Sequence, residues 1–139
     1  MKKALLTGVL SLVLLTGCGK VEKIECTQSQ KSFGVEMNQV INVEIKGNKF
    51  VNLDMTIDAV LPENLLSQKE TFISSLEKTY AGMESKLGTV PTTTETENGA
   101  QIKYEMNAEQ AKKFAGTNNT KVTKKEVIET FEKQGYTCK

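Results

Sequence analysis

Residues 35–57 read VEMNQVINVEIKGNKFVNLDMTI, and this stretch decides the fold. Apolar and polar residues alternate on both sides of Gly47-Asn48, a pattern typical of a half-buried antiparallel hairpin. A two-residue turn would pair Ile45 with Phe50 and send the two apolar rows to opposite faces of the sheet. A three-residue loop would pair Ile45 with Val51 and keep both rows on one face. We therefore predict the three-residue loop.

A helical pattern follows this hairpin. Apolar residues recur three and four positions apart over residues 65–87, which predicts one long amphipathic helix. Asn64 or Ser67 is its expected N-cap, and Gly88 stands where a helix-ending glycine belongs.

The rest of the chain predicts shorter elements. A second hairpin turns at Asn98-Gly99, the strongest short turn signal. Asn107 with Gln110, and Thr123 with Glu126, are capping patterns that begin two short helices. Strands at 24–28 and 136–138 lie at the two ends. The expected fold is α+β: an antiparallel sheet of two hairpins plus terminal strands, packed on one face by one long helix and two shorter C-terminal helices.

The first 17 residues have the features of an export leader. A positive start precedes an apolar stretch of roughly a dozen residues, which is shorter than the ~20 needed to cross a bilayer as a helix. The stretch ends in Leu15-Thr16-Gly17-Cys18, which resembles the lipobox of bacterial lipoproteins. That resemblance implies cleavage before Cys18 and lipidation of its thiol. Residues 18–23 are then a lipidated cysteine with a short tether, and 24–139 a single domain at the extracytoplasmic face of the cell membrane.

Two further cysteines remain if Cys18 carries lipid. An even number of cysteines in an exported chain favours a disulfide, here Cys26–Cys138. The alternative is a reactive thiol, but the chain has no CxxC motif and no histidine to lower a thiol pKa.

The composition argues against catalysis. The chain has no histidine and no arginine, so the usual general base and the bidentate anion clamp are missing. No nucleophile-elbow, P-loop or dinucleotide-binding motif is present. Asp54 and Asp58 share the polar face of a strand about 13 Å apart, too far to act as a direct acid–base pair. We expect no enzyme activity, no cofactor and no metal site, and assign the oxygen-rich face around them to solvent.

Charge patterning yields one candidate surface. The 18 basic residues, all lysines, nearly balance 17 acidic residues, which disfavours nucleic acid as a partner. Lysines nevertheless cluster around the last two predicted helices, two of them in a first helical turn where the helix dipole disfavours cations. The cluster comprises Lys112, Lys113, Lys121, Lys124 and Lys125. It is a candidate surface for an anionic partner such as lipid headgroups or wall polymer, unless nearby glutamates neutralise it. Phe33 and Phe50 are candidate exposed contacts or parts of the core.

The layout of the chain is similar to the YehR-like lipoproteins of unknown function, and to small lipoproteins of low-GC Gram-positive bacteria. The likeness lies in the lipobox, the 35–57 hairpin, the 72–87 helix and a closing helix over 123–135. It implies a membrane-anchored, non-catalytic domain and supplies no catalytic residues. Two functions stay open: a binding domain for an envelope protein, wall polymer or small ligand, or an accessory protein of an envelope complex with no ligand of its own. A concave apolar pocket between the long helix and the sheet would favour the first, and a packed domain with an exposed apolar patch the second.

Overall fold

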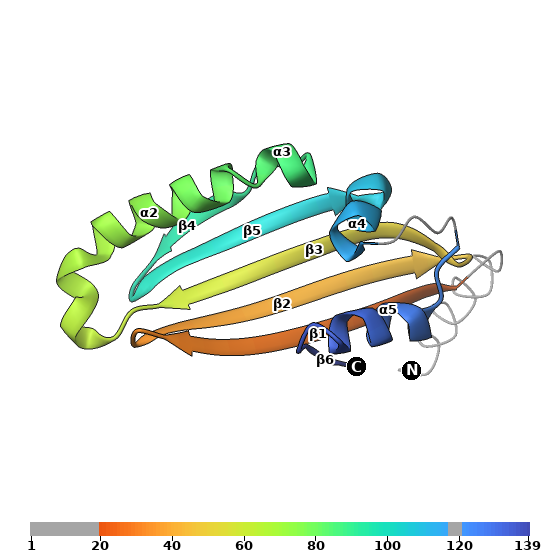
Figure 1. The fold of residues 1–139 in the computed structure, drawn as a ribbon, viewed down its shortest axis with the longest axis horizontal. Helices are drawn as coiled ribbons and strands as arrows, with labels where there is room; N and C mark the ends of the chain where they lie inside the picture. The colour runs from red at the N-terminus through yellow and green to blue at the C-terminus, as the bar shows by residue number, and fades with distance from the viewer. Residues whose placement is uncertain (1–19, 117–120) are drawn as a thin grey trace, which may run out of the picture.

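A six-stranded antiparallel sheet organises the computed structural model, which describes residues 20–116 and 121–139 (Figure 1). The strands lie in the order β4-β5-β3-β2-β1-β6. The strands are β1 (Val21–Ser32), β2 (Val35–Lys46), β3 (Lys49–Val60), β4 (Thr92–Thr96), β5 (Gly99–Asn107) and β6 (Thr137–Cys138). The helices are η1 (Glu63–Gln68), α2 (Lys69–Ala81), α3 (Glu84–Leu87), α4 (Ala108–Ala115) and α5 (Lys124–Glu132). The α+β class and the antiparallel sheet agree with the sequence prediction.

The β2–β3 hairpin corrects the predicted loop. Its turn has two residues, Gly47 and Asn48, both with positive φ (58° and 59°), and Ile45 pairs with Phe50. A bulge at Val51 then restores the parity of the strand, so that Phe50 and Leu53 are both buried. Both apolar rows share one face, as predicted, because the bulge inserts the extra residue that a three-residue loop was expected to supply.

The first strand is longer than predicted. β1 runs from Val21 to Ser32 and forms a hairpin with β2, in place of the short strand expected at 24–28. The turn is Phe33-Gly34, again with positive φ at both positions (51° and 81°). This turn was missed because an aromatic residue rarely adopts the left-handed conformation that a two-residue hairpin turn requires.

The predicted long helix is divided into three pieces. A 3-10 segment, η1, begins after Pro62, α2 follows, and the helix breaks at Gly82 before the short α3. Neither predicted N-cap is used: the residues that precede η1 and α2 make no side-chain cap hydrogen bond. The predicted end is correct, since Gly88 is left-handed with a φ of 70°.

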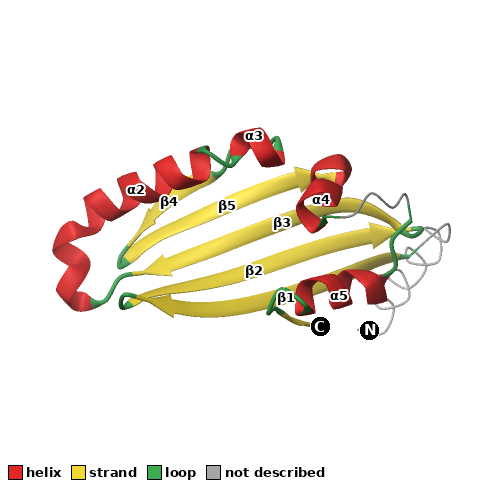
Figure 2. Cartoon of the chain, viewed as in Figure 1, coloured by secondary structure: helices red, strands yellow, loops and turns green. Residues whose placement is uncertain are grey.

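The two C-terminal helices begin at their predicted capping boxes, at Asn107 and Thr123. They cover the sheet face that carries the buried strand residues, where α4 packs on β3 and α5 on β1 (Figure 2). Their buried residues Ala111, Val127 and Phe131 join the core of the sheet. The opposite face carries the polar alternate residues of the strands.

The two long hairpins turn at opposite ends of the sheet (Figure 1). We call the end that holds Lys20, Val21 and the Gly47-Asn48 turn the Lys20 end. The end that holds the Phe33-Gly34 turn is the Phe33 end. Twelve residues of β1 separate them, about 40 Å at the usual rise of a strand.

Candidate functional site

The lysine cluster expected from the sequence is only partly assembled. Lys124 and Lys125 begin α5, and the backbone N–H of Val122 donates to the carbonyl oxygen of Asn48 at 2.7 Å. This contact holds Lys121 and the start of α5 at the Lys20 end. Lys112 and Lys113 lie instead on α4, at the last turn, where the helix dipole favours cations.

Neighbouring glutamates pair with two lysines of the cluster. Lys112 lies 3.6 Å from Glu109, and Lys125 lies 3.9 Å from Glu129. Lys121 and Lys124 make no ion pair with any residue that the structure describes. Part of the cluster is therefore locally balanced, and part is not.

Sequence reasoning missed two lysines that the sheet brings to the same end. Lys46 and Lys49 flank the Gly47-Asn48 turn and pair with each other across the hairpin. Val21 of β1 pairs with Lys46, which places Lys20 beside them. The signal was available in the sequence, because lysines on both sides of a hairpin turn must lie at one end of the sheet.

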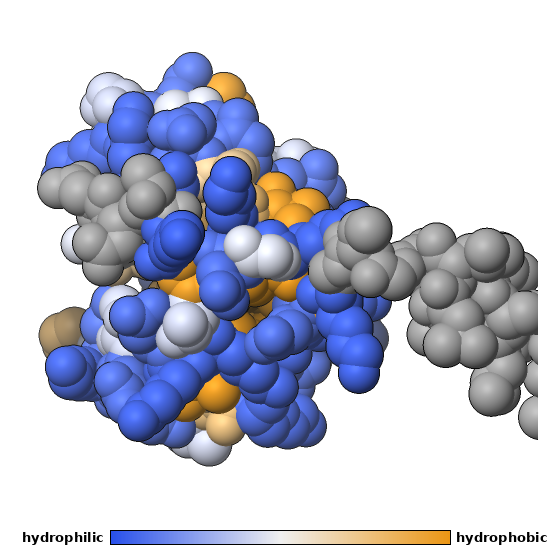
Figure 3. Space-filling view, turned by 90° about the vertical axis from the view of Figure 1, so that its right-hand side faces the viewer, coloured by the Kyte–Doolittle hydropathy of each residue, from blue (hydrophilic) through white to orange (hydrophobic). Residues whose placement is uncertain are grey.

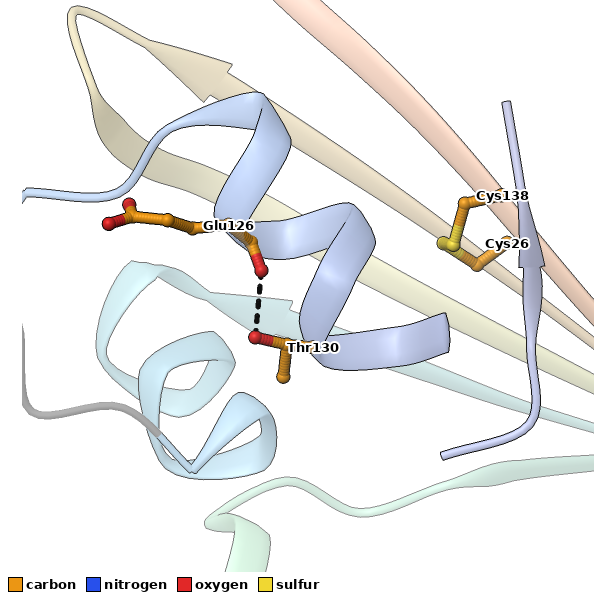
Figure 4. The surroundings of a disulfide bond; sticks show 4 residues. All are labelled: Cys26, Glu126, Thr130 and Cys138. Atoms are coloured by element: carbon orange, nitrogen blue, oxygen red, sulfur yellow. Dashed lines mark hydrogen bonds between the residues drawn. A yellow bond between two sulfur atoms is a disulfide. The ribbon is translucent and has the colours of Figure 1, made fainter. Parts of the chain in front are cut away.

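The predicted disulfide joins the first and last strands (Figure 4). The sulfur atoms of Cys26 and Cys138 are 2.02 Å apart and 112 residues separate them in sequence. Glu25 and Lys139 exchange both backbone hydrogen bonds next to the disulfide, at 3.0 and 2.9 Å. The two cysteines thus form the neighbouring non-hydrogen-bonded pair of the antiparallel ladder, in which opposing side chains approach most closely. Neither thiol is free, so the reactive-thiol alternative does not apply to the structure.

The polar face of the sheet carries the two aspartates. Asn42 pairs with Asp54 and Asn38 with Asp58, as the predicted parity requires. The side-chain amide of Gln101 donates to Asp58 at 2.9 Å. A depression of about 460 Å³ on this face is lined by residues of β1, β2 and β3, among them Asn42 and Asp54, together with Lys139. Among the described residues, no three potential metal-ligating side chains gather at one place.

A tyrosine pair lies between α2 and the sheet, where a pocket was considered. The rings of Tyr80 on α2 and Tyr104 on β5 meet edge to face, with centroids 6.0 Å apart. Tyr104 is fully buried, and its hydroxyl has no hydrogen-bond partner among the described residues. Burial, with a smaller contribution from Tyr80, raises the pKa of Tyr104 to about 12. The contact between α2 and the sheet is therefore packed with aromatic side chains. The hydroxyl of a third tyrosine, Tyr136, donates to the Gln39 side chain at 2.6 Å.

The two candidate phenylalanines have opposite roles. Phe50 is buried in the core, at 4% exposure, because the bulge turns it inward. Phe33 is 97% exposed at the tip of the β1–β2 hairpin. Gly34 beside it lies against Pro62, where an added Cβ would come within 3.3 Å of the proline ring. Phe33 is thus a projecting aromatic side chain on a closely packed turn.

Cys18, the predicted site of lipidation, lies outside the described residues. Within them, no helix has the length and apolar character needed to cross a bilayer.

Comparison with known proteins gives a structural neighbour. No protein-family model and no curated protein sequence matches the chain. The solution structure of E. coli YehR matches with a TM-score of 0.54 and 17% sequence identity, over 86% of this chain and 91% of that one. The chain has a YehR-like fold. This agrees with the resemblance inferred from the sequence and concerns the fold alone.

Proposed function

We propose that the protein is a lipoprotein anchored at the extracytoplasmic face of the cell membrane, with a domain that acts by binding and not by catalysis. The Cys26–Cys138 disulfide is the observation that carries this proposal. Disulfides of this kind persist in exported proteins and are rare in the cytosol. The first cysteine of the pair, Cys26, lies eight residues after Cys18, the last residue of the sequence that resembles a lipobox, which agrees with export followed by anchoring through Cys18.

The anchoring is tested by acyl labelling. Cells that express the protein are fed an alkyne-bearing fatty acid, and the captured protein is compared with a Cys18→Ser variant. We expect label on the wild type, no label on the variant, and a larger unprocessed variant in place of the mature chain. Equal labelling of both proteins, or a wild type that partitions with the cytosol, would contradict the proposal.

The absence of catalysis is supported by the chemistry of the chain. Without histidine or arginine, the groups left for proton transfer are carboxylates, lysines and tyrosines. The buried Tyr104 has a raised pKa, which makes its hydroxyl a poorer acid at neutral pH. Phosphatase, esterase and peptidase substrates should therefore show no turnover above that of a buffer control.

An accessory role in an envelope complex is the second candidate, and Phe33 favours it. An aromatic ring that is 97% exposed is the kind of side chain that anchors protein–protein contacts. A photo-crosslinking amino acid at position 33, with one at position 78 on α2 as control, distinguishes the two functions in intact cells. A single protein captured from position 33 alone would favour the accessory role, whereas no capture from either position would favour a soluble ligand or polymer.

A further inference from the structure

The Lys20 end gathers lysines from three separate stretches of the chain. We call Lys20, Lys46, Lys49, Lys121 and Lys124 the end lysines. Strand pairing brings the first three together, and the hydrogen bond from Val122 to Asn48 adds the other two. All five side chains are exposed. They lie at the start of β1, beside the turn of the β2–β3 hairpin and at the start of α5, which meet at this end of the sheet (Figure 1).

The positive charge of these lysines is only partly balanced locally. None of the five makes an ion pair with a described residue. Of the nearby carboxylates, Glu44 lies 3.9 Å from Lys23, and that of Glu126 accepts from the backbone N–H of Thr123 at 2.8 Å, a hydrogen bond that leaves its negative charge in place. Glu126 and the exposed Glu22 therefore offset two of the five charges. The net charge of this end is positive, although the whole chain is nearly neutral.

Exposed apolar side chains lie among these lysines. Val21 is 47% exposed and Val51 is 43% exposed, the latter because the bulge pushes it out of the strand alternation. Figure 3 views this end and shows apolar atoms between mostly hydrophilic ones. Lysines around small apolar side chains suit the headgroup region of a bilayer, where the ammonium groups meet phosphates and the valines meet the acyl boundary.

The closeness of Cys18 to the end lysines in the sequence indicates which partner they bind. Cys18 precedes Lys20 by two residues, which reach at most about 7 Å even when fully extended. An acyl anchor on Cys18 therefore holds this end, and no other, against the membrane surface. We infer that the end lysines bind anionic lipid headgroups and stand the sheet upright, with Phe33 about 40 Å from the bilayer surface. The inference rests on the proposed anchoring of the protein.

Lysine footprinting of the anchored protein tests this inference. The mature lipoprotein, purified with its acyl chains, is reconstituted into vesicles of phosphatidylcholine alone or with 30 mol% phosphatidylglycerol. A water-soluble acetylating reagent is added, and mass spectrometry gives the acetylation rate of each lysine. Each lysine near an anionic surface strengthens the attraction about fivefold at low salt. We expect the end lysines to react at least about threefold more slowly on the anionic vesicles, and 0.5 M salt to abolish the difference. Lys31 and Lys78, which lie away from this end, should react equally on both.

A charge-reversal variant and a matched control sharpen the test. In Lys46→Glu/Lys49→Glu/Lys124→Glu, Lys20 and Lys121 remain as reporters and should lose their protection. The control variant Lys31→Glu/Lys78→Glu/Lys86→Glu changes the net charge by the same amount, and its end lysines should keep their protection. Thermal unfolding of both variants establishes that they are folded.

Three other outcomes would overturn the inference, and they can be told apart. Equal reactivity of all lysines on both vesicles, in protein that floats with them, would refute the lipid contact and leave the anchoring intact. Protein that carries no acyl chain and does not float would refute the anchoring and the inference with it. Equal protection by soluble poly(glycerol phosphate) in the absence of vesicles, with none on the anionic vesicles, would identify a wall-type polymer as the partner.

Discussion

The two helices that flank the sheet, α5 and α2, differ in how firmly they are attached. α5 has nine residues, a complete capping box and two buried residues, Val127 and Phe131. α2 has thirteen residues but no side-chain cap and no buried residue. Its partly buried Leu76 and Tyr80 reach the core from the side of β5. Length and helical periodicity therefore did not indicate which helix is bound more tightly.

The same contrast holds for the two ends of the sheet. The Lys20 end is secured by the contact of Val122 with the Gly47-Asn48 turn, and α5 leads into the strand that carries the disulfide. At the Phe33 end, η1 has no buried residue and the hairpin tip projects into solvent. The helix with the complete capping box and the contact that holds it to a hairpin turn thus lie in the part of the domain nearest to the proposed membrane anchor. The Phe33 end is left available for contacts.

The largest effect is expected from removal of the disulfide. Cys26→Ser/Cys138→Ser opens a loop of more than 100 residues and should lower the free energy of unfolding by about 4–5 kcal/mol in the chain-entropy model. Urea unfolding measures the loss, and reduction of the wild type should reproduce it while leaving the variant unchanged. Hydrogen exchange should rise first in α5 and β6. A uniform rise that includes α2 to the same degree would contradict the division described above.

Truncation of one phenylalanine on each helix measures the difference in attachment directly. Phe131 is fully buried between the rings of Phe114 and Tyr136, with centroids 6.1 and 5.8 Å away. Phe131→Ala should cost about 3–5 kcal/mol of stability. Phe72→Ala, at a half-buried position on α2, should cost about 1 kcal/mol. Similar losses in the two variants would mean that α2 is held as firmly as α5.

The stability that the contact between α2 and the sheet provides should fall at alkaline pH. The pKa of Tyr104 is raised to about 12, and those of Tyr80 and Tyr136 are also raised by burial. A folded-state pKa above the unfolded value of about 10 means that the unfolded chain loses its protons first. Stability is then complete below pH 10 and falls by roughly 1–3 kcal/mol as the pH rises toward 12.

Tyr104→Phe is the control for this dependence. It removes a buried hydroxyl that has no partner among the described residues, so stability at pH 7 should stay equal or rise by about 1 kcal/mol. The alkaline loss, measured by urea unfolding at pH 8 and pH 11, should shrink. A large loss at pH 7 would instead mean that the hydroxyl has a bound partner such as an internal water.

The caps of the two helices should differ by a smaller amount. Thr123 accepts a hydrogen bond from the backbone N–H of Glu126 at 3.2 Å, and Thr123→Ala should cost about 1 kcal/mol. Ser67→Ala, at a cap predicted for the long helix but unused in the structure, should change stability by less than about 0.3 kcal/mol. Thermal unfolding of the two variants side by side measures this difference, and equal losses would show that Ser67 does cap its helix.

The features that were predicted correctly are local ones. Alternation and capping boxes each depend on residues a few positions apart, and they identified the strands, α4 and α5. The second hairpin was also predicted, but it turns at Glu97-Asn98, one residue before the expected Asn98-Gly99, because Thr96 pairs with Gly99. The bulge at Val51 was missed because parity arguments assume a regular ladder. The Lys20 end was missed in part because Lys46 and Lys121 meet only through pairing of distant segments. The disulfide could be predicted from the sequence because the cysteine count left a single pair once Cys18 was assigned to lipidation.

The smallest expected effect concerns the two hairpin turns, which have the same backbone conformation but different residues. Asn48 suits its positive φ of 59°, whereas Phe33 holds a φ of 51° with no contact that explains it. Phe33→Asn should therefore raise the free energy of unfolding by about 0.5–1 kcal/mol, and Asn48→Phe should lower it by a similar amount. Chemical denaturation of both variants tests the sign. An aromatic residue kept at a cost in stability, on the end farthest from the proposed anchor, is best explained by contact with a partner. Phe33→Asn should then stabilise the isolated protein and weaken partner capture in cells. A loss of stability on Phe33→Asn would mean that the ring supports the fold, and the argument for a contact at this end would fail.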